Sequence, residues 1–242
     1  MIDIHNHVLP GIDDGSRNKE ESISILKKLN DIGFNTVICT PHYICGTRYN
    51  KNNRDKKILL NQIKSDLIKD NIKVDLYLGN EVYINNEINE LVLKGEISTL
   101  DNSRFILVEL SFNDELYNVG DYIYKLKRIG YIPIIAHPER YKYFQNDYKK
   151  LDELILDGVL FQCNYGSIIG KYGKEAKKLF KYMLSNDLVT FLSTDVHRSD
   201  SEIIKNFEKI KKKIIRIIGE DKFKKISNDN ALEIFKVENH KK

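Results

Sequence analysis

The sequence predicts an α/β barrel in which seven parallel strands alternate with helices. Seven short apolar runs recur along the 242 residues, and most are separated by segments with the apolar spacing of a helix. Strands that alternate with helices pair in parallel through crossover connections. Five of the six histidines lie at the carboxyl ends of these runs. A barrel gathers all carboxyl strand ends on one rim, so this convergence favours a barrel over an open sheet.

The expected strands are four to eight residues long or slightly shorter, and they are rich in β-branched and apolar side chains. They lie at residues 2–4, 36–39, 74–78, 105–110, 132–136, 159–163 and 189–193. Because the runs are almost continuously apolar, we expect both faces of the sheet to be covered.

The expected helices carry an apolar stripe at helical spacing and lie between or after these strands. They lie at residues 20–32, 56–70, 119–129, 149–156, 174–186 and 202–218. Asn18, with Glu21 three residues later, resembles a capping box at the start of the first helix. A polar stretch at 43–55 is expected to be a long loop, and 82–104 contains a short helical pattern. No linker or shift in composition divides the chain, so we expect one domain over residues 1–242.

Composition indicates a globular protein, since 41% of the residues are hydrophobic and 31% are charged. The net charge of +4 is small and dispersed, which gives no indication of a nucleic-acid partner. The cysteines Cys39, Cys45 and Cys163 form no Cys-x-x-Cys pair, which favours a reducing compartment. No apolar stretch approaches ~18 residues and no signal peptide is visible, so we expect a cytoplasmic protein without a transmembrane segment.

Histidine and carboxylate side chains at the strand ends form the candidate chemical site. The candidate metal ligands are His5, His7, Asp14, His42, Glu81, Glu109, His137, Asp195 and His197. His5 and His7 are two residues apart, so on a strand they point to the same face. Glu109 stands in an apolar run, where a carboxylate is costly unless it is paired or bound to metal. On residue type alone, Asp13 is an alternative to Asp14.

Taken singly, a His-x-His pair or the Asp195-x-His197 pair is weak support for a metal site. Together at one rim they favour such a site strongly, and the donors suit zinc, manganese or iron. Nine ligands exceed what one ion needs, so two or three ions with bridging carboxylates are expected. Two-metal sites can carry out in-line phosphoryl displacement.

Six tyrosines also fall near the rim, and their ordinary interpretation is loop packing. The alternative is an aromatic wall for a phosphotyrosyl ring. They are Tyr43, Tyr49, Tyr83, Tyr117, Tyr141 and Tyr165. The sequence contains neither a Cys-x5-Arg loop nor a glycine-rich phosphate loop, which disfavours a thiol nucleophile and a nucleotide-binding fold.

Several ordered motifs resemble the PHP family, named for polymerase and histidinol phosphatase. Within it, the sequence is most similar to bacterial protein-tyrosine phosphatases of capsule and exopolysaccharide systems, from Met1 to about Phe235. The motifs are His5-Asn6-His7-Val8-Leu9-Pro10-Gly11-Ile12-Asp13-Asp14-Gly15, Thr40-Pro41-His42, Gly79-Asn80-Glu81-Val82-Tyr83, Leu107-Val108-Glu109-Leu110-Ser111, Ala136-His137-Pro138-Glu139-Arg140-Tyr141 and Ser193-Thr194-Asp195-Val196-His197.

The resemblance implies a distorted (βα)7 barrel with a trinuclear site, commonly of manganese, with iron, zinc or cobalt also used. It assigns the nine ligands to three ions, with Glu109 as a bridge and with Asp14 rather than Asp13 as a ligand. The groups are His5, His7, Glu109 and Asp195 for the first ion, Glu81, Glu109 and His137 for the second, and Asp14, His42 and His197 for the third.

The activity implied is hydrolysis of phosphotyrosine on the tyrosine-rich tail of a tyrosine autokinase, with a metal-activated hydroxide as nucleophile. The expected catalytic residues are Arg140, His42, Asp195 and His197, with Arg140 clamping a phosphoryl oxygen. Relatives often carry a second arginine several residues after the Asp-x-His motif, where this sequence has only the adjacent Arg198. The alternatives are a small-molecule phosphatase such as histidinol-phosphatase, a non-catalytic docking or regulatory module of the kinase system, and a DNA exonuclease module.

Overall fold

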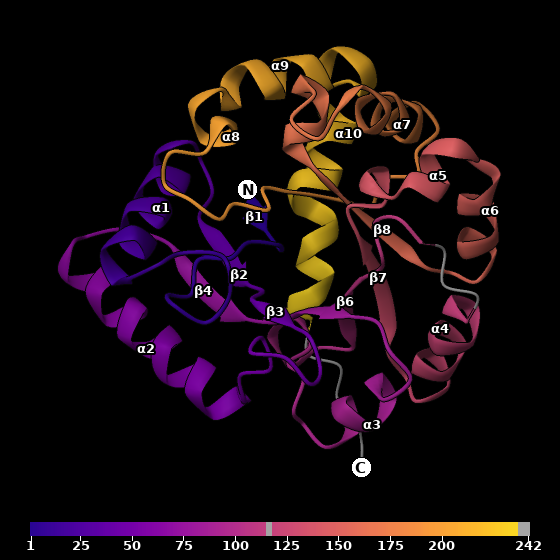
Figure 1. Ribbon diagram of the computed structural model, residues 1–242. Helices are drawn as coiled ribbons and strands as arrows, with labels where there is room; N and C mark the ends of the chain where they lie inside the picture. The colour runs from indigo at the N-terminus through magenta and orange to yellow at the C-terminus, as the bar shows by residue number, and fades with distance from the viewer. Residues whose placement is uncertain (115–117, 237–242) are drawn as a thin grey trace.

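A computed structural model describes residues 1–114 and 118–236 of the chain, and all of its strands pair in parallel. The strands are β1 (Ile2–Asp3), β2 (Thr36–Cys39), β3 (His42–Tyr43), β4 (Asp75–Leu78), β5 (Glu81–Tyr83), β6 (Phe105–Glu109), β7 (Ile132–Ala136), β8 (Leu160–Asn164) and β9 (Phe191–Ser193). They form a three-stranded sheet in the order β1-β2-β4 and a six-stranded sheet in the order β3-β5-β6-β7-β8-β9. Helices surround these strands (Figure 1).

The two sheets are parts of one seven-stave barrel, because two staves are interrupted. Thr40 and Pro41 separate β2 from β3, and Gly79 and Asn80 separate β4 from β5. Backbone bonds still join these staves at the interruptions, since Gly79 donates to the Cys39 carbonyl at 2.8 Å. Proline lacks the N–H that a continuous ladder requires. The predicted seven-stranded barrel is therefore confirmed, with its distortion located at these two breaks.

The barrel closes between its first and last staves through the loops that follow them. The Asp195 N–H donates to the His5 carbonyl at 2.9 Å, and the His7 N–H donates to the Val196 carbonyl at 3.0 Å. Deeper in the barrel, the Asp3 carboxylate accepts from the Thr194 N–H at 2.9 Å and from the Thr194 hydroxyl at 2.6 Å. Closure thus places the two candidate ligand segments, 5–7 and 195–197, side by side.

The helices pack on the outside of the barrel, where their buried faces and the outward faces of the strands form the larger hydrophobic core. They are α1 (Lys19–Asp31), α2 (Asn53–Lys69), α3 (Ile88–Leu93), α4 (Val119–Arg128), α5 (Lys142–Asn146), α6 (Lys149–Leu156), α7 (Lys174–Ser185), α8 (Glu202–Lys205), α9 (Phe207–Ile218) and α10 (Glu220–Lys224). The expected cap of α1 is present, because the Asn18 side chain accepts from the Glu21 N–H at 2.9 Å.

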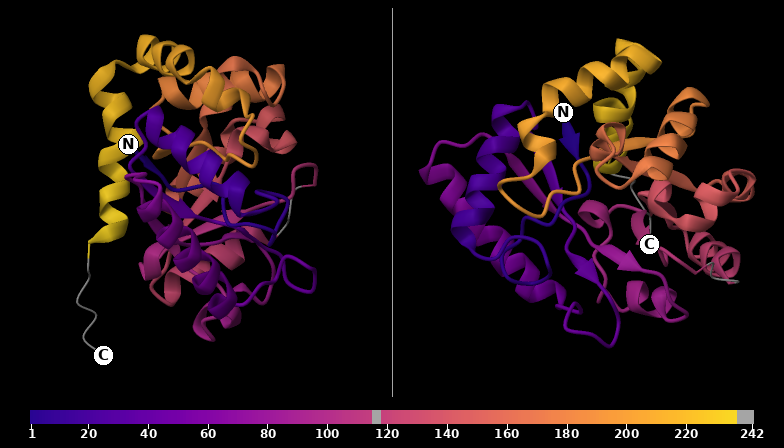
Figure 2. Two further views of the ribbon diagram at one scale, coloured as in Figure 1. Left: turned by 90° about the vertical axis from the view of Figure 1, so that its left-hand side faces the viewer. Right: turned by 45° about the horizontal axis from the view of Figure 1, so that its top comes forward.

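The last described segment of the chain covers the end of the barrel opposite the histidines. After α10, a π-helical turn at Lys225–Asp229 and a 3-10 segment at Asn230–Phe235 continue the same path. Figures 1 and 2 show this segment, in yellow, crossing one end of the ring of strands. Ala231 and Ile234 pack there with inward-facing strand residues such as Ile38.

Several expected boundaries differ from the structure. The helix expected at 202–218 is divided into α8 and α9 at Asn206, whose N–H ends the first helix by bonding to the Glu202 carbonyl. The loop expected at 43–55 is shorter, because His42–Tyr43 forms a strand. In addition, α2 begins at Asn53, three residues before its predicted start, with Asn52 as its cap. In the described part of the chain, no helix combines the length and hydropathy needed to span a membrane.

Candidate active site

All nine predicted ligands meet at the carboxyl rim of the barrel, although they come from six of its seven staves. The side chains fall into overlapping groups whose ligand atoms lie within 4.8 Å of one another. The groups are His7, Asp14, His42 and His197; His5, His7 and Glu81; His5, His137 and Asp195; and His42, Glu81 and Glu109. The prediction that these residues converge is confirmed, while their roles as ligands remain a proposal.

The innermost group surrounds a point between the first and last staves. The His5 and His7 Nε2 atoms are 3.3 Å apart, and each lies 3.3 Å from the Glu81 Oε2 atom. The Asp195 Oδ1 atom is 3.6 Å from His5 Nε2 and 3.4 Å from His7 Nε2. Four donors arranged tetrahedrally at about 2.1 Å from one ion lie about 3.4 Å from one another. The spacing of these four atoms therefore suits a shared metal ion.

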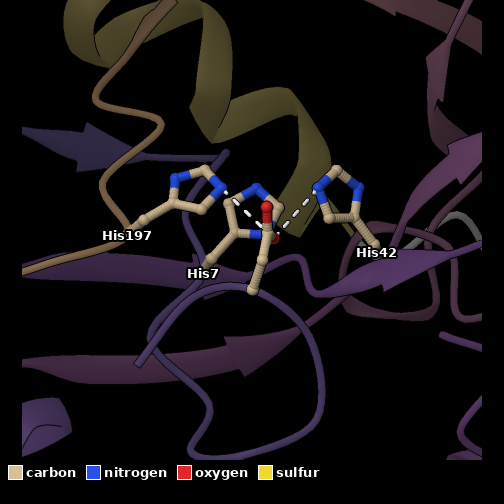
Figure 3. Close-up of side chains that lie close together, drawn as sticks. His7, His42 and His197 are labelled. Atoms are coloured by element: carbon tan, nitrogen blue, oxygen red, sulfur yellow. Dashed lines mark ion pairs between the residues drawn. The ribbon is translucent and has the colours of Figure 1, made fainter. Parts of the chain in front are cut away.

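A second group lies nearer to solvent and contains Asp14. Its Oδ1 atom is 3.4 Å from His42 Nε2 and 3.6 Å from His197 Nε2. Figure 3 shows the His7, His42 and His197 side chains gathered together, with dashed lines from His42 and His197 to the carboxylate between them. The Asp14 side chain is 53% exposed and that of His197 is 29% exposed, whereas His7 is fully buried. A substrate arriving from solvent therefore meets this group first.

Glu81 is the carboxylate that lies close to most of the candidate histidines. Besides His5 and His7, its Oε2 atom lies 3.0 Å from His42 Nδ1, and its Oε1 atom lies 2.8 Å from His137 Nε2. Glu109 is more distant, at 3.7 Å from His42 Nδ1 and from His137 Nε2. These distances suit Glu81 as a bridging carboxylate better than Glu109, whose assignment as the bridge stays a prediction.

Hydrogen bonds from the far side of the rings determine which nitrogen faces the cluster. His7 Nδ1 donates to the Asp13 carboxylate at 2.8 Å, and His197 Nδ1 donates to the Asp195 carbonyl at 3.0 Å. His5 Nδ1 donates to the Gln162 side-chain oxygen at 2.7 Å. Because each Nδ1 carries the proton, each neutral ring presents the lone pair of Nε2 to the cluster, as a metal ligand requires.

The same contacts separate the roles of Asp13 and Asp14. Both oxygens of the Asp13 carboxylate already accept hydrogen bonds. Besides the bond from His7, they accept from the Gly15 N–H at 2.9 Å and from the His42 N–H at 3.1 Å. Asp14 instead faces the rings of the outer group. A side chain at Gly15 would overlap the His7 backbone, so the turn can bring these two aspartates to the rim only with glycine there. The geometry supports Asp14 as the ligand and Asp13 as the residue that orients His7.

Two of the candidate ligands have left-handed backbone conformations. The φ angles are 33° at His137 and 49° at Asp195. His137 directly follows β7, and Asp195 is the second residue after β9. Non-glycine residues adopt this region at a cost of about 1 kcal/mol or more, and such strain is concentrated at functional sites. The turns aim both side chains into the barrel mouth.

The charged groups perturb one another strongly. Although burial opposes it, the carboxylates of Glu81 and Asp195 raise the pKa of His5 to about 9. Burial and the charge of Glu81 raise the pKa of Glu109 to about 8. Burial and Arg140 lower the pKa of His137 to about 4. Close carboxylates and imidazoles are thus held together by shared protons, and cations would take the place of those protons.

Two further observations test whether the residues suit metal ions. The His42 Nδ1 and Glu81 Oε2 atoms are 3.0 Å apart, yet they are not aligned for a hydrogen bond with each other. Neither atom has a hydrogen-bond partner among the described residues. The His5 and His7 Nε2 atoms face each other while both Nδ1 protons are used elsewhere. Two buried ring nitrogens that face one another need a proton or a metal ion between them. The donor set of imidazoles and carboxylates fits manganese, zinc or iron.

Metal binding is therefore expected to release protons. At about pH 7 the His5 ring, with a pKa of about 9, holds a proton that an incoming ion must displace. Because the raised pKa belongs to the metal-free protein, the apparent metal affinity should rise as the pH increases toward 9, and fewer protons should be released as the pH approaches that value. Calorimetric titrations with Mn²⁺ in buffers of different ionisation enthalpy measure the release. Equal affinity and no release between pH 6 and 9 would contradict this electrostatic description.

Arg140 lies beside the cluster and is held on three sides. Its guanidinium carbon is 4.6 Å from the centre of the Phe112 ring and 4.6 Å from that of Tyr172. One nitrogen, Nη1, donates to the Asp195 Oδ2 atom at 3.0 Å. A guanidinium has five N–H donors, so most of them stay available for a phosphoryl group. Its ionic partner is Asp195 and not the adjacent Glu139.

Arg198, which the sequence made a doubtful second phosphate clamp, contacts two backbone carbonyls at the rim. Its Nη1 atom donates to the carbonyl of Gly15 and, at 3.3 Å, to that of His197. These contacts fasten the loop that carries Asp14 to the loop that carries His197. The structure supports a structural role for this arginine.

The cysteines lie outside the cluster and their surroundings do not favour thiolates. Cys39 and Cys163 are buried, and burial raises the pKa of Cys39 to about 12. The Cys45 thiol donates to the Glu87 carboxylate at 3.2 Å, which raises its pKa. These environments agree with the absence of a cysteine-phosphatase motif.

Most of the rim tyrosines that the structure describes are packed in the protein interior. Tyr43, Tyr141 and Tyr165 are buried, and Tyr117 lies outside the described residues. Tyr49 differs, because its half-buried ring is stacked on the His42 ring at 5.9 Å between centres. Sequence reasoning missed two buried amides of β8, Gln162 and Asn164, which contact candidate ligands. The available signal was a pair of polar residues alternating within an apolar strand.

The fold and the rim cluster define the class of protein: a PHP-type barrel of the kind found in metal-dependent phosphatases. The family model for capsular polysaccharide synthesis proteins CpsB/CapC matches residues 1–236. The chain belongs to this CpsB/CapC family.

Named relatives are similar over most of their lengths. The CapC protein of Staphylococcus aureus is 36% identical over 197 residues, which cover 81% of this chain and 77% of that protein. The tyrosine-protein phosphatase CpsB of Streptococcus pneumoniae is 32% identical over 208 residues, or 83% of this chain and 84% of the relative.

Solved structures give the same result. A structure from work on Bacillus subtilis YwqE and Streptococcus pneumoniae CpsB, described as metal-dependent tyrosine phosphatases, matches with a TM-score of 0.85 and 28% identity. The match covers 91% of this chain and 89% of the chain in that structure. A histidinol phosphate phosphatase from Lactococcus lactis shares the fold, with a TM-score of 0.57, 15% identity and coverage of 88% and 93% of the two chains. The predicted family resemblance, barrel fold and phosphatase class of enzyme are confirmed.

Proposed function

We propose that this protein is a metal-dependent protein-tyrosine phosphatase that holds two or three ions, manganese above all, in the nine-residue cluster at its rim. The observation that carries the proposal is the convergence of nine histidine and carboxylate side chains beside a positioned arginine. The relatives named as tyrosine-protein phosphatases supply the substrate class.

When bound, the ions would activate a water molecule and neutralise negative charge on the phosphoryl group. The residues of this chain position the reaction. Of the residues assigned as catalytic from the sequence, His42 and His197 belong to the outer group nearer to solvent, whereas Asp195 is buried and has Arg140 beside it. We assign Arg140 to a non-bridging phosphoryl oxygen, since its fork of N–H groups suits that geometry.

Aromatic rings flank the cluster on two sides, which supports an aryl phosphate as substrate. The Tyr49 ring is stacked on His42, and the Phe112 ring is stacked on His137 at 5.5 Å between centres. Both rings are half-buried and therefore partly accessible. A phenyl leaving group placed over the outer group of ligands would contact the Tyr49 side of the rim. This favours phosphotyrosine over the phosphorylated alcohol of the histidinol-phosphatase alternative.

The substrate we propose is the phosphotyrosine-bearing tail of a capsule-system tyrosine autokinase, met in the cytoplasm by a single domain over residues 1–242. The family's association with capsular polysaccharide synthesis supports this setting. The free, unpaired cysteines Cys39, Cys45 and Cys163 agree with a reducing compartment.

The test compares a phosphotyrosyl peptide with histidinol phosphate on the wild-type enzyme and on Tyr49→Ala. We expect the wild type to hydrolyse the peptide with the higher kcat/KM. Loss of ring stacking, worth about 0.5–1.5 kcal/mol, should raise KM for the peptide up to about tenfold in Tyr49→Ala and leave metal content unchanged.

Tyr49→Phe serves as the matched control, since it keeps the ring, and its KM should stay near that of the wild type. Preference for histidinol phosphate would favour the small-molecule alternative. No hydrolysis of either compound by metal-loaded protein would favour the non-catalytic docking module.

A further inference from the structure

Strand β8 is the one stave of the described barrel that contributes none of the nine candidate ligands. Two of its inward-facing residues are nevertheless polar: Gln162 and Asn164 are both fully buried. Cys163, between them, faces the outer core. Burying two amides in a barrel is costly unless their hydrogen bonds are satisfied, so their partners show what they do.

The two amides form a continuous chain between two candidate ligands from opposite ends of the sequence. The Gln162 Oε1 atom accepts from His5 Nδ1 at 2.7 Å, and the Gln162 Nε2 atom donates to the Asn164 Oδ1 atom at 2.9 Å. The Asn164 Nδ2 atom then donates to the Asp195 Oδ2 atom at 2.7 Å. His5 and Asp195 are thus connected through two side chains and three hydrogen bonds.

The chain can run in only one direction, because its last member is a carboxylate. Asp195 can only accept, so the Asn164 amide must turn its NH₂ group toward it and its oxygen toward Gln162. Gln162 must then donate to Asn164 and present its own oxygen to His5. The His5 proton is consequently held on Nδ1, and the Nε2 lone pair faces His7, Glu81 and the centre of the cluster.

The chain also fixes Asp195, whose backbone is in the left-handed region. Asn164 and Arg140 both donate to Oδ2, which leaves Oδ1 directed toward His5 and His7. The Asn164 N–H donates in turn to the buried Glu139 carboxylate at 2.8 Å, next to Arg140 in sequence. One strand therefore locks the orientation of a histidine, an aspartate and the segment of the phosphate-clamping arginine.

We propose that Gln162 and Asn164 are positioning residues that set the proton arrangement of His5 and the orientation of Asp195 before metal binds. The inference rests on the proposed metal-dependent function and deepens it. Neutral amides suit this role, since they order two ligands without adding charge to a cluster that already contains four carboxylates. Partners of this kind change metal affinity by about 10–100-fold.

The experiment measures Mn²⁺ and Zn²⁺ affinity by competition with a chelator, alongside thermal unfolding of the metal-free protein. The variants are Gln162→Met, Asn164→Leu and the double variant, which keep side-chain volume but remove the hydrogen bonds. Asn230→Leu is the control, because the Asn230 amide donates to the Thr190 carbonyl at the opposite end of the barrel. We expect each β8 variant to lose about 10–100-fold in affinity and the control to lose none.

Two outcomes separate positioning from space filling. Gln162→Met and Asn164→Leu break the same chain of hydrogen bonds. The double variant should therefore lose little more metal affinity than the worse single variant, whereas the losses from independent contributions would multiply. Gln162→Glu retains an acceptor for His5 Nδ1 but cannot donate to Asn164, so it should restore only part of the affinity lost in Gln162→Met, whereas a role in packing predicts no such recovery. Unchanged affinity in folded Gln162→Met and Asn164→Leu overturns the proposal.

Failure of the proposed function would be visible separately. Wild-type protein that binds metal but does not hydrolyse phosphotyrosine would overturn the phosphatase assignment, while the affinities of the variants would still decide the positioning role. Wild-type protein that binds neither ion would overturn both.

Discussion

Glu81→Gln is expected to reduce phosphatase activity by a factor on the order of 10³ and to lower the number of bound ions. Glu81 has oxygen atoms within 3.3 Å of His5, His7 and His42. It is ionised because, despite burial, the rings of His5, His42 and His137 hold its pKa well below the usual range. Glutamine preserves the shape but removes the charge that ions need, and several kcal/mol of charge stabilisation corresponds to that factor. Metal analysis and phosphopeptide turnover measure the two effects.

Two matched variants show whether the position of Glu81 is special. Glu96→Gln removes an exposed carboxylate that accepts from the Tyr43 hydroxyl at 3.3 Å outside the cluster, and it should keep wild-type metal content and activity. Glu109→Gln should also be damaging, but less so than Glu81→Gln, since Glu109 lies 3.7 Å from its nearest imidazole nitrogens. Full metal occupancy in Glu81→Gln would remove the bridging assignment.

Arg140→Ala is expected to lower kcat/KM for phosphopeptide by a factor on the order of 10²–10³, the size typical of one lost charge-stabilising donor. The bound metal ions and the fold should persist, because Arg140 contacts Asp195 through Oδ2 and leaves Oδ1 with His5 and His7. Inhibition by free phosphate should weaken in parallel. Steady-state kinetics, phosphate inhibition and metal analysis on one preparation test all three expectations.

Arg140→Lys is the informative companion, since it keeps the charge without the planar fork and should recover only part of the loss. The ion pair with Asp195 offers a purely structural alternative for this arginine. Wild-type turnover with wild-type phosphate inhibition in Arg140→Ala would support that alternative, as would loss of the fold.

The position of the ligands could be predicted from the sequence because it depends on topology. Every candidate ligand except Asp14 lies within an apolar run or at most four residues after one, and parallel staves bring such ends together whatever the details of packing. His5 and His7 were placed on one face by strand periodicity alone. The buried Glu109 in its apolar run was likewise a recognisable sign of function.

Finer assignments depend on side-chain direction, which spacing does not determine. Asp13 and Asp14 are equivalent in sequence, and only the turn closed by Gly15 sends one to His7 and the other to the outer group. The interruptions at Pro41 and Gly79 divide two staves, and they were invisible in the apolar pattern because both flanking segments remain strand-like. Gln162 and Asn164 were overlooked because amides carry no charge to mark them as ligands.

The central claim is that the rim cluster holds the ions on which phosphotyrosine hydrolysis depends. The most direct measurement removes metal exhaustively, quantifies what remains, and follows phosphopeptide hydrolysis while Mn²⁺ is added back in known amounts. We expect no activity without metal and a return of activity that requires more than one ion per chain, with none returning in Glu81→Gln. Full turnover by protein shown to contain no metal would contradict the account.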